Sequence, residues 1–423
     1  MLVSVSQFRI LFFRILRFGY PLLATVWLSA CATNTSSADP DPPLPVVLLV
    51  SVDGFRADYL DSDLTPNLNT LASRGIRAEA LIPSFPTKTF PNHYTMVTGL
   101  RPDHHGLVAN NMWDPEMESS YSLGDREAVQ NPAWYGGTPV WVTAEQAGLA
   151  TAPMFWPGSE APIHGVRPRH WLPYDGDMTH EARIDWVLDR LSATGTDRVR
   201  FATLYFDDVD VAGHGFGPGS TEVARAVARI DSSIGLLLES LRTRGLDEID
   251  LIIVSDHGMS RLSRDRMIFV DDYIDPDSVR IVDWSPVLAL WPDSAQQSSV
   301  YEALRGAHPN LHVFLRHEIP PDLGFGSHPR VAPIIGLADP GWSISTRDYF
   351  RRNTGRFQGG NHGYDQRSAD MRALFIAAGP GFRLGMVVPP FPNVDVYEVI
   401  MTILGLTPAP GDGDLDRVKA MLQ

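Results

Sequence analysis

Runs of apolar residues along the chain predict alternating strands and helices. Residues 46–52 read Val-Val-Leu-Leu-Val-Ser-Val, a pattern typical of a strand that is buried on both faces of a parallel sheet. We expect a helix next, because Thr65 is a good N-cap residue, Pro66 suits a first helical turn and Gly75 is a typical helix terminator.

The same alternation continues downstream. Apolar strands are predicted at residues 201–206 and 251–254, and a long helix is predicted at residues 221–244, where apolar residues recur along one side. Strands that alternate with helices indicate an α/β fold with a doubly wound, largely parallel sheet flanked by helices. Residues 279–292 also look strand-like and indicate a small inserted subsidiary region.

The N-terminus indicates export. Three arginines precede an apolar stretch at residues 18–28, which is too short to span a bilayer and is typical of a secretory signal. Leu-Ser-Ala then precedes Cys31, and this tetrapeptide resembles the bacterial lipoprotein box. We predict a lipoprotein signal peptide over residues 1–30, a flexible tether over 31–45 and one folded body over 46–423. The protein would be exported, periplasmic and anchored to a membrane through Cys31; a plain cleaved signal and a soluble periplasmic product is the alternative.

Composition narrows the classes of function. Cys31 is the only cysteine, which excludes an intramolecular disulfide, a thiolate metal site and a catalytic thiol. The formal net charge is −15 and no basic run follows the N-terminus, so specific binding of a nucleic-acid duplex is not expected. A small phosphate substrate remains compatible with this charge, because metal ions held by carboxylates reverse the local field.

Acidic residues and histidines cluster just beyond the predicted strands. Asp53, Asp210 and Asp256 each follow the end of one strand, and His214 and His257 lie near two of them. An open α/β sheet places its site at this edge. Carboxylates and imidazoles without thiolates favour zinc or a similar transition ion. The number of donors predicts two ions, which would clamp the attacking and leaving oxygens of a displacement at phosphorus.

A candidate nucleophile precedes another predicted helix. Residues 85–94 read Phe-Pro-Thr-Lys-Thr-Phe-Pro-Asn-His-Tyr, and Pro91 suits the first turn of a helix that runs to about Gly99. Thr89 then lies at the helix N-terminus, where exposed amides favour a phosphoryl group. Its hydroxyl needs a metal ion or a base for activation. Lys88 is not predicted as a site residue, and its side chain is expected to be solvated or to make an accessory contact with phosphate.

Five motifs, in this order along most of the chain, together resemble the bacterial nucleotide pyrophosphatase/phosphodiesterase family of the alkaline phosphatase superfamily. They are Val-Ser-Val-Asp-Gly-Phe-Arg at residues 50–56, Thr-Lys-Thr-Phe-Pro-Asn-His at 87–93, Asp-Val-Ala-Gly-His at 210–214, Ser-Asp-His-Gly-Met at 255–259 and Gly-Asn-His-Gly-Tyr-Asp at 360–365. Any one of them alone would be a weak signal.

The resemblance implies zinc-dependent hydrolysis of nucleotide phosphodiester or pyrophosphate bonds, such as ATP to AMP and pyrophosphate. The reaction would pass through a covalent nucleotidyl intermediate on Thr89, and Asn110 would donate to a phosphate oxygen in the transition state. Residues 46–423 would be the catalytic phosphodiesterase domain. The resemblance implies two Zn²⁺ ions, one held by Asp210, His214 and His362 and the other by Asp53, Asp256, His257 and the nucleophile Thr89.

Aromatic residues near the nucleophile complete the candidate site. Phe90, Tyr174 and Tyr205 are expected to form a slot for a nucleobase, because bases stack on aromatic rings. We expect His93 to be structural. Neighbours of the ligand motifs, Asp207 and Asp208, are also expected to be structural or supporting groups.

Four alternatives remain. A phosphomonoesterase of the same superfamily would need a positive clamp for a doubly charged phosphate, and no arginine follows Thr89. A sulfatase would need Cys or Ser as nucleophile. A phosphodiesterase acting on lysophospholipids or other choline phosphodiesters is compatible with the same motifs. An inactive nucleotide-binding protein would lack a ligand or the nucleophile, whereas this chain has all of them. The sequence makes no prediction of oligomeric state.

Overall fold

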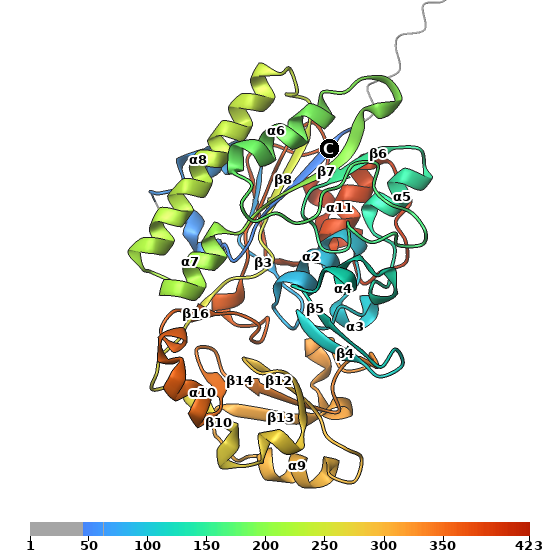
Figure 1. The fold of residues 1–423 in the computed structure, drawn as a ribbon. Helices are drawn as coiled ribbons and strands as arrows, with labels where there is room; N and C mark the ends of the chain where they lie inside the picture. The colour runs from blue at the N-terminus through green and yellow to red at the C-terminus, as the bar shows by residue number, and fades with distance from the viewer. Residues whose placement is uncertain (1–44, 62) are drawn as a thin grey trace, which may run out of the picture. The chain divides into compact units, whose positions relative to one another are not determined.

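A seven-stranded sheet in the order β18-β2-β17-β8-β1-β7-β6 lies at the centre of the fold (Figure 1). The computed structural model describes residues 45–61 and 63–423. The strands are β1 (Val47–Val52), β2 (Ile76–Ala78), β6 (Ala150–Pro153), β7 (Val199–Phe206), β8 (Asp250–Val254), β17 (Phe375–Ala378) and β18 (Met386–Val388). Strands β6, β7, β1 and β8 are parallel, and β17 runs antiparallel to both of its neighbours. The predicted largely parallel sheet is confirmed.

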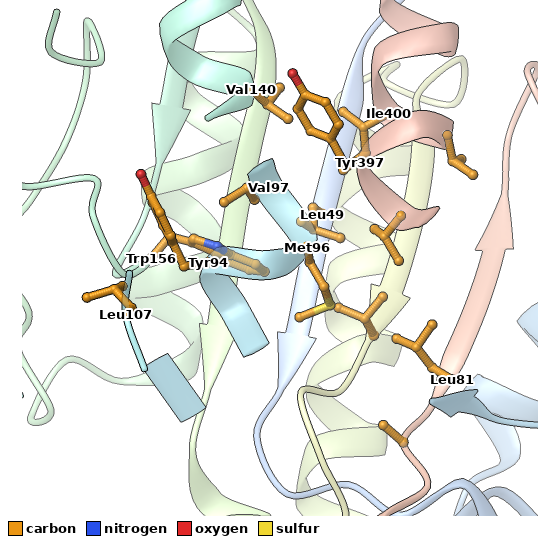
Figure 2. Close-up of a cluster of buried hydrophobic side chains, with 14 of the residues drawn as sticks. Leu49, Leu81, Tyr94, Met96, Val97, Leu107, Val140, Trp156, Tyr397 and Ile400 are labelled. Atoms are coloured by element: carbon orange, nitrogen blue, oxygen red, sulfur yellow. The ribbon is translucent and has the colours of Figure 1, made fainter. Parts of the chain in front are cut away.

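Helices cover both faces of this sheet. Along β1, Val47 and Leu49 enter one buried apolar cluster, whereas Leu48 and Val50 enter another, because successive side chains point to opposite faces. Figure 2 shows Leu49 in the first cluster, with Met96 and Tyr397. The first cluster is covered by α2 (Thr89–Thr98), α5 (Val140–Gln146) and α11 (Asp395–Leu404), and the second by α1 (Pro66–Arg74), α6 (His180–Leu191) and α8 (Thr221–Thr243).

The helix boundaries follow the predicted signals, with one exception. Gly99 ends α2 with a φ of 67°, a left-handed conformation that glycine adopts without strain. The prediction that the Thr65 side chain caps α1 is wrong, because its hydroxyl donates to the Leu60 carbonyl oxygen. The carboxylate of Asp231, on α8, instead accepts from the backbone N–H groups of Asn67 and Leu68 at 3.1 and 2.8 Å. A tertiary contact therefore supplies the cap that the local sequence was expected to supply.

A second, four-stranded sheet forms the subsidiary region. Residues 279–292 contain two antiparallel strands, β11 (Arg280–Asp283) and β12 (Val287–Trp291). They continue into β14 (Ile334–Ala338) and β13 (Leu311–Leu315), and α9 (Gln297–Leu304) packs in the same apolar cluster. Nearby lie β10 (Met267–Phe269) paired with β15 (Ser343–Ser345), β9 (Ser260–Arg261) paired with β16 (Gly360–Asn361), and the helices α7 (Asp208–Phe216) and α10 (Arg347–Arg352).

The smaller elements are β3 (Leu81–Ile82), β4 (Asn111–Asp114), β5 (Ser119–Ser122), β19 (Phe391–Pro392), α3 (Pro102–His105), α4 (Arg126–Gln130) and α12 (Leu415–Val418). The predicted signal peptide, the anchor at Cys31 and the tether up to residue 44 lie outside the described residues. None of the helices in the described part of the chain has the length and hydropathy needed to cross a bilayer.

Candidate active site

The carboxyl ends of β1, β7 and β8 meet at one edge of the central sheet, and the predicted acidic residues lie there. Asp53 directly follows β1, and its N–H donates to Phe206 O at the end of β7, 2.9 Å away. Gly54 N donates to Asp256 Oδ1 at 3.1 Å, which joins the ends of β1 and β8. Gly54 has a φ of 68°, and a Cβ there would lie 2.9 Å from the Asp210 Cα atom. Only glycine fits this close approach to the first turn of α7 (Asp208–Phe216).

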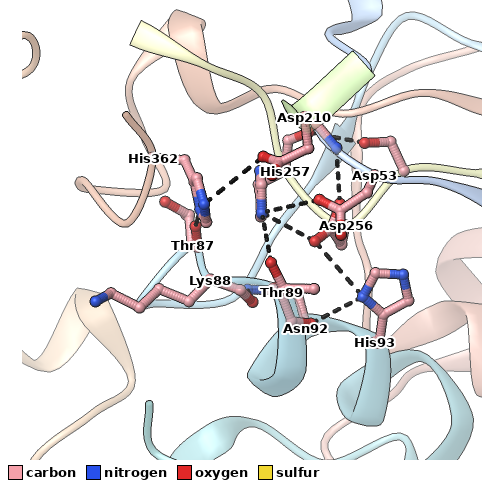
Figure 3. Close-up of polar contacts among 12 residues, drawn as sticks. Asp53, Thr87, Lys88, Thr89, Asn92, His93, Asp210, Asp256, His257 and His362 are labelled. Atoms are coloured by element: carbon pink, nitrogen blue, oxygen red, sulfur yellow. Dashed lines mark hydrogen bonds and ion pairs between the residues drawn. The ribbon is translucent and has the colours of Figure 1, made fainter. Parts of the chain in front are cut away.

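One half of the cluster is formed by Asp53, Asp256 and His257 (Figure 3). His257 Nε2 lies 2.9 Å from Asp256 Oδ2 and 3.5 Å from Asp53 Oδ1. Thr89 is the first residue of α2, and its Oγ1 atom lies 3.4 Å from the same imidazole nitrogen. The candidate nucleophile and three predicted ligands therefore converge on one point.

The other half is formed around Asp210, in the first turn of α7. Its Oδ2 atom lies 3.5 Å from His214 Nε2, and its Oδ1 atom lies 3.8 Å from His362 Nε2. The His362 ring stacks on the His257 ring with centroids 3.5 Å apart and an interplanar angle of 13°. The two halves are therefore adjacent, and together they contain every residue that the sequence predicts as a metal ligand.

Backbone carbonyl groups orient the three predicted histidine ligands. Each Nδ1 atom lies within hydrogen-bond distance of a carbonyl oxygen, which can only accept, so Nδ1 carries the proton. In the neutral ring the lone pair is then on Nε2, the atom that faces the carboxylates. The pairs are His214 with Gly360 at 3.0 Å, His257 with Gly258 at 2.9 Å and His362 with Thr87 at 2.8 Å.

His93 is also close to the carboxylates, but both of its ring nitrogens are engaged elsewhere. Its Nδ1 atom lies 2.8 Å from the Thr89 carbonyl oxygen, and its Nε2 atom lies 2.8 Å from Ser51 Oγ. Although Nδ1 is 3.5 Å from Asp256 Oδ2, a nitrogen that donates a proton has no lone pair for a metal ion. This geometry favours a structural role, in which His93 holds the backbone of the nucleophile.

Three buried carboxylate oxygens in the cluster, Asp53 Oδ1, Asp210 Oδ1 and Asp256 Oδ2, have no hydrogen-bond partner among the described residues. Burial, together with the charges of Asp256 and Asp210, raises the pKa of Asp53 well above its usual range. Burial also raises the pKa of Asp210. The cost of this crowded negative charge is removed when a cation binds the free oxygens.

Burial and the neighbouring His257 and His214 side chains hold the pKa of His362 well below its ordinary value, so the ring is neutral and able to bind a metal ion. Two groups of residues each have ligand atoms that all lie within 4.8 Å of one another. One group is Asp210, His257 and His362, and the other is Asp53, His93 and Asp256. The structure therefore contains acidic and imidazole groups that could hold a metal ion.

These two groups differ from the sets implied by the resemblance in the places of His214, His257 and His93. His257 stacks on His362 and also touches Asp256, so its Nε2 atom lies between the two halves. His214 is oriented towards Asp210 by Gly360 O and is the most exposed of the three predicted histidine ligands. Since His93 has no free nitrogen, the six predicted ligands suit a metal site better than a set that includes His93.

Asn110 and the predicted aromatic slot lie beside Thr89. Asn110 Oδ1 accepts from Phe90 N at 3.0 Å, so the amide NH₂ is the group that remains for a substrate oxygen. A pocket of about 100 Å³ is lined by Thr89, Phe90, Tyr174 and Tyr205, among others. The two tyrosine rings are 6.4 Å apart at 68°. The structure thus brings together residues separated by more than a hundred positions in the chain.

Two contacts were missed by sequence reasoning. Tyr205 was expected only in the slot, yet its hydroxyl also donates to Asp53 Oδ2 at 2.6 Å. Lys88 is neither solvated nor directed at the nucleophile, because it is buried and forms an ion pair with Asp283 of β11. Figure 3 shows its side chain extending away from the ligand cluster. Only the position of Tyr205 next to the end of a strand was a usable signal.

Asp207 and Asp208 lie outside the ligand cluster, as expected from the spacing. Asp207 Oδ2 accepts from the Tyr174 hydroxyl at 2.9 Å, and Asp208 Oδ2 lies 2.8 Å from His180 Nε2. Asp207 therefore supports the slot, whereas Asp208 ties α7 to α6.

Several known proteins are similar to this chain in sequence. A sequence model described as "Type I phosphodiesterase / nucleotide pyrophosphatase" matches residues 47–365. Ectonucleotide pyrophosphatase/phosphodiesterase family member 5 of Homo sapiens is 36% identical, with 95% of this chain and 83% of that protein covered. The bis(5'-adenosyl)-triphosphatase ENPP4 of Bos taurus is 36% identical, with 95% and 86% covered. Family member 1 of Homo sapiens is 38% identical, but the chain spans 42% of its length.

A solved structure of one relative has a fold similar to that of this chain. Murine family member 5, as an inactive threonine-to-alanine variant in complex with AMP, has a TM-score of 0.86 and 36% identity, with 90% of this chain and 100% of that chain covered. The fold is therefore alkaline phosphatase-like. The relatives compared are animal proteins, so the bacterial assignment stays a prediction.

Proposed function

Because the chain belongs to the type I phosphodiesterase/nucleotide pyrophosphatase family, whose members are hydrolases of phosphodiesters, we propose that it cleaves nucleotide phosphodiester and pyrophosphate bonds and releases a nucleoside monophosphate. The observation that carries this proposal is the position of the Thr89 hydroxyl, 3.4 Å from His257 Nε2 at the start of a helix. It faces a buried cluster of carboxylates and imidazoles with unpaired oxygens.

Two zinc ions are proposed as cofactors. One would be held by Asp210, His214 and His362, and the other by Asp53, Asp256 and His257 together with the Thr89 oxygen. When bound, the ions would favour the deprotonated forms of the Thr89 hydroxyl and of an attacking water, and would neutralise charge on the phosphoryl oxygens. The unpaired carboxylate oxygens and the Nδ1–H tautomers of the histidines support this assignment.

The protein residues would then carry out two displacements at phosphorus. Thr89 Oγ1 forms a bond to phosphorus as the bond to the leaving oxygen breaks, which gives a nucleotidyl-threonine. Water attacks next from the side of Asp210 and His214, and the Thr89 hydroxyl is restored. Asn110 donates its amide N–H groups to a phosphoryl oxygen, and the dipole at the N-terminus of α2 favours the same charge. Two inversions give net retention of configuration at phosphorus.

A nucleotide substrate is supported by the pocket lined by Phe90, Tyr174 and Tyr205, which would stack on the base. The solved relative in complex with AMP also supports it. A diester or pyrophosphate bond is favoured over a terminal monoester. The only cation next to Thr89 in sequence is Lys88, whose charge is taken by Asp283, so it supplies no clamp for a doubly charged phosphate.

Product analysis tests this function. The full chain, purified in detergent and supplied with zinc, is given ATP, bis-p-nitrophenyl phosphate or p-nitrophenyl phosphate. We expect AMP and pyrophosphate from ATP, and cleavage of the diester over the monoester. Thr89→Ala should abolish turnover, and its zinc content should stay close to that of the wild-type protein. ADP and phosphate as products would place the protein with the phosphomonoesterases, and wild-type turnover by Thr89→Ala would refute the nucleophile.

A further inference from the structure

Helix α7 contains Asp210 and His214, two of the proposed metal ligands, yet its own sequence stabilises it poorly. Two of its nine residues are glycines, which are among the weakest helix formers. The preceding residue, Asp207, makes no capping hydrogen bond to the helix backbone, and its carboxylate accepts from the Tyr174 hydroxyl instead. The position of these two ligands therefore depends on contacts that other elements make with α7.

Asp208, the first residue of α7, makes such contacts with α6 and α8, which lie beside α7 in Figure 1. Its Oδ2 atom lies 2.8 Å from Nε2 of His180, the first residue of α6, and its Oδ1 atom accepts from Nε of Arg229 on α8. The side chains of Asp208 and His180 are each 15% exposed, whereas that of Arg229 is 58% exposed. Because solvent screens exposed ion pairs, His180 provides the stronger contact.

The His180 ring is held on its other sides as well. Its Nδ1 atom lies 2.7 Å from Oγ of Ser233, and this hydroxyl donates its own proton to the Arg229 carbonyl oxygen at 3.1 Å. The Ser233 oxygen therefore accepts from Nδ1–H, and the Asp208 carboxylate accepts at Nε2. Both ring nitrogens donate, as they do in the protonated imidazole. The ring also packs edge-on against Phe206, the last residue of β7, with centroids 4.6 Å apart.

Asp208 and Asp210 lie in the same helical turn, so a constraint on one acts on the other. The residue between them, Val209, is buried in the apolar cluster that α6 and α8 cover. A zinc–oxygen or zinc–nitrogen bond is about 2.0–2.2 Å long and tolerates a deviation of only about 0.2 Å. A small shift of the first turn of α7 is therefore enough to weaken metal binding at Asp210.

We propose that His180 is a positioning residue for the reaction. Through Asp208 it fixes the first turn of α7, and in this way it places Asp210 and His214 for the metal ion of their half. The inference rests on the proposed function. The contacts of His180 in the described part of the chain are with Asp208, Ser233 and the Phe206 ring, so it acts only through other residues.

Zinc binding measures this role separately from turnover. The full chain in detergent is titrated with zinc in competition with a chromophoric chelator, as wild type and as His180→Phe. Phenylalanine keeps a ring against Phe206 and removes both N–H donors. We expect two zinc ions in the wild type and about tenfold weaker binding of one of them in the variant, the lower end of the range for supporting contacts. The kcat for ATP should fall at limiting zinc, with little change in KM.

Two further variants test the path through Asp208. Asp208→Ala should weaken the same zinc ion, and adding His180→Phe to it should cause no further loss, because the shared contact is already absent. Ser233→Ala leaves both partners in place and removes only the acceptor of Nδ1–H, so it should weaken zinc binding by a smaller factor.

Arg244→Met is the matched control on the same helix. Arg244 forms ion pairs with Asp185 and Asp189, which lie further along α6, so its loss also removes a contact between α6 and the end of α8. We expect this variant to bind both zinc ions with native affinity.

The outcomes distinguish this proposal from the function on which it rests. A wild type that binds fewer than two zinc ions would overturn the proposed cofactors together with the role of His180. Two bound ions with native affinity in Asp208→Ala, whether or not His180→Phe folds, would overturn the positioning role alone. An equal loss of affinity in His180→Phe and Arg244→Met would indicate a general effect of loosening α6 and would also refute the proposal.

Discussion

Tyr205 links the aromatic slot to the proposed zinc site, and Tyr205→Phe tests that link. The hydroxyl donates to Asp53 Oδ2 at 2.6 Å, a length typical of a hydrogen bond from a hydroxyl to a charged oxygen. Such a bond contributes about 1.5–3 kcal/mol, and supporting contacts of this kind change metal affinity about 10- to 100-fold. Phenylalanine keeps the ring, so stacking in the slot should be retained. We therefore expect weaker zinc binding with little change in nucleotide affinity at saturating zinc.

The pH dependence should change in a defined direction. The Tyr205 hydrogen bond lowers the pKa of Asp53, which burial and neighbouring carboxylates otherwise raise, so its loss raises that pKa further. Protons then compete better with zinc, and the loss of affinity should grow as pH falls. Competition with a chromophoric chelator at pH 6 and pH 8 measures both effects. Tyr174→Phe is the control, because its hydroxyl donates to Asp207, outside the cluster. Native zinc affinity in Tyr205→Phe at both pH values would refute the reasoning.

Three further predictions concern stability and localisation. Asp283→Leu leaves Lys88 buried without its partner, so the free energy of unfolding in urea should fall by about 3–5 kcal/mol. The double variant Lys88→Met/Asp283→Leu should recover most of that stability. Equal stability of the single and the double variant would contradict this. Burial raises the pKa of Asp250 to about 6, so its neutral form stabilises the fold at low pH and that stability is lost as pH rises through 6. The Tm of Asp250→Asn should therefore increase relative to wild type between pH 4 and pH 7.5, and a constant difference would argue against it. Cys31→Ser should release the protein from membranes with its activity intact, and membrane association that persists in cell fractions would remove the anchor.

The strands that carry the site were predictable because their signals are local. The apolar runs before Asp53 and Asp256 are complete in the sequence, and the fold brings their carboxyl ends together through the parallel pairing of β1 with β7 and β8. The helix at Thr89 was equally accessible, because a proline in the first turn and Gly99 at the end define it. Residue type and position after a strand were enough to select Asp53, Asp210, Asp256 and His257 as candidates.

Contacts between distant segments could not be predicted in this way. The cap of α1 comes from Asp231 on α8, 163 to 164 positions away from its partners, and nothing near Thr65 signals it. The partner of Lys88 is Asp283 of the subsidiary sheet, and a buried lysine cannot be recognised without that partner. A cavity of about 1190 Å³ that is lined by His214, Tyr349 and Arg356 likewise depends on how β11, β15 and α10 lie against α7.

Capture of the covalent intermediate tests the central claim most directly. The zinc-loaded full chain is mixed with ATP for milliseconds, quenched in acid, digested and examined by mass spectrometry. The account predicts an added AMP moiety on the peptide that contains Thr89, and no such peptide from Thr89→Ala. An adduct on any other residue, or hydrolysis with inversion at phosphorus and without an adduct, would contradict it.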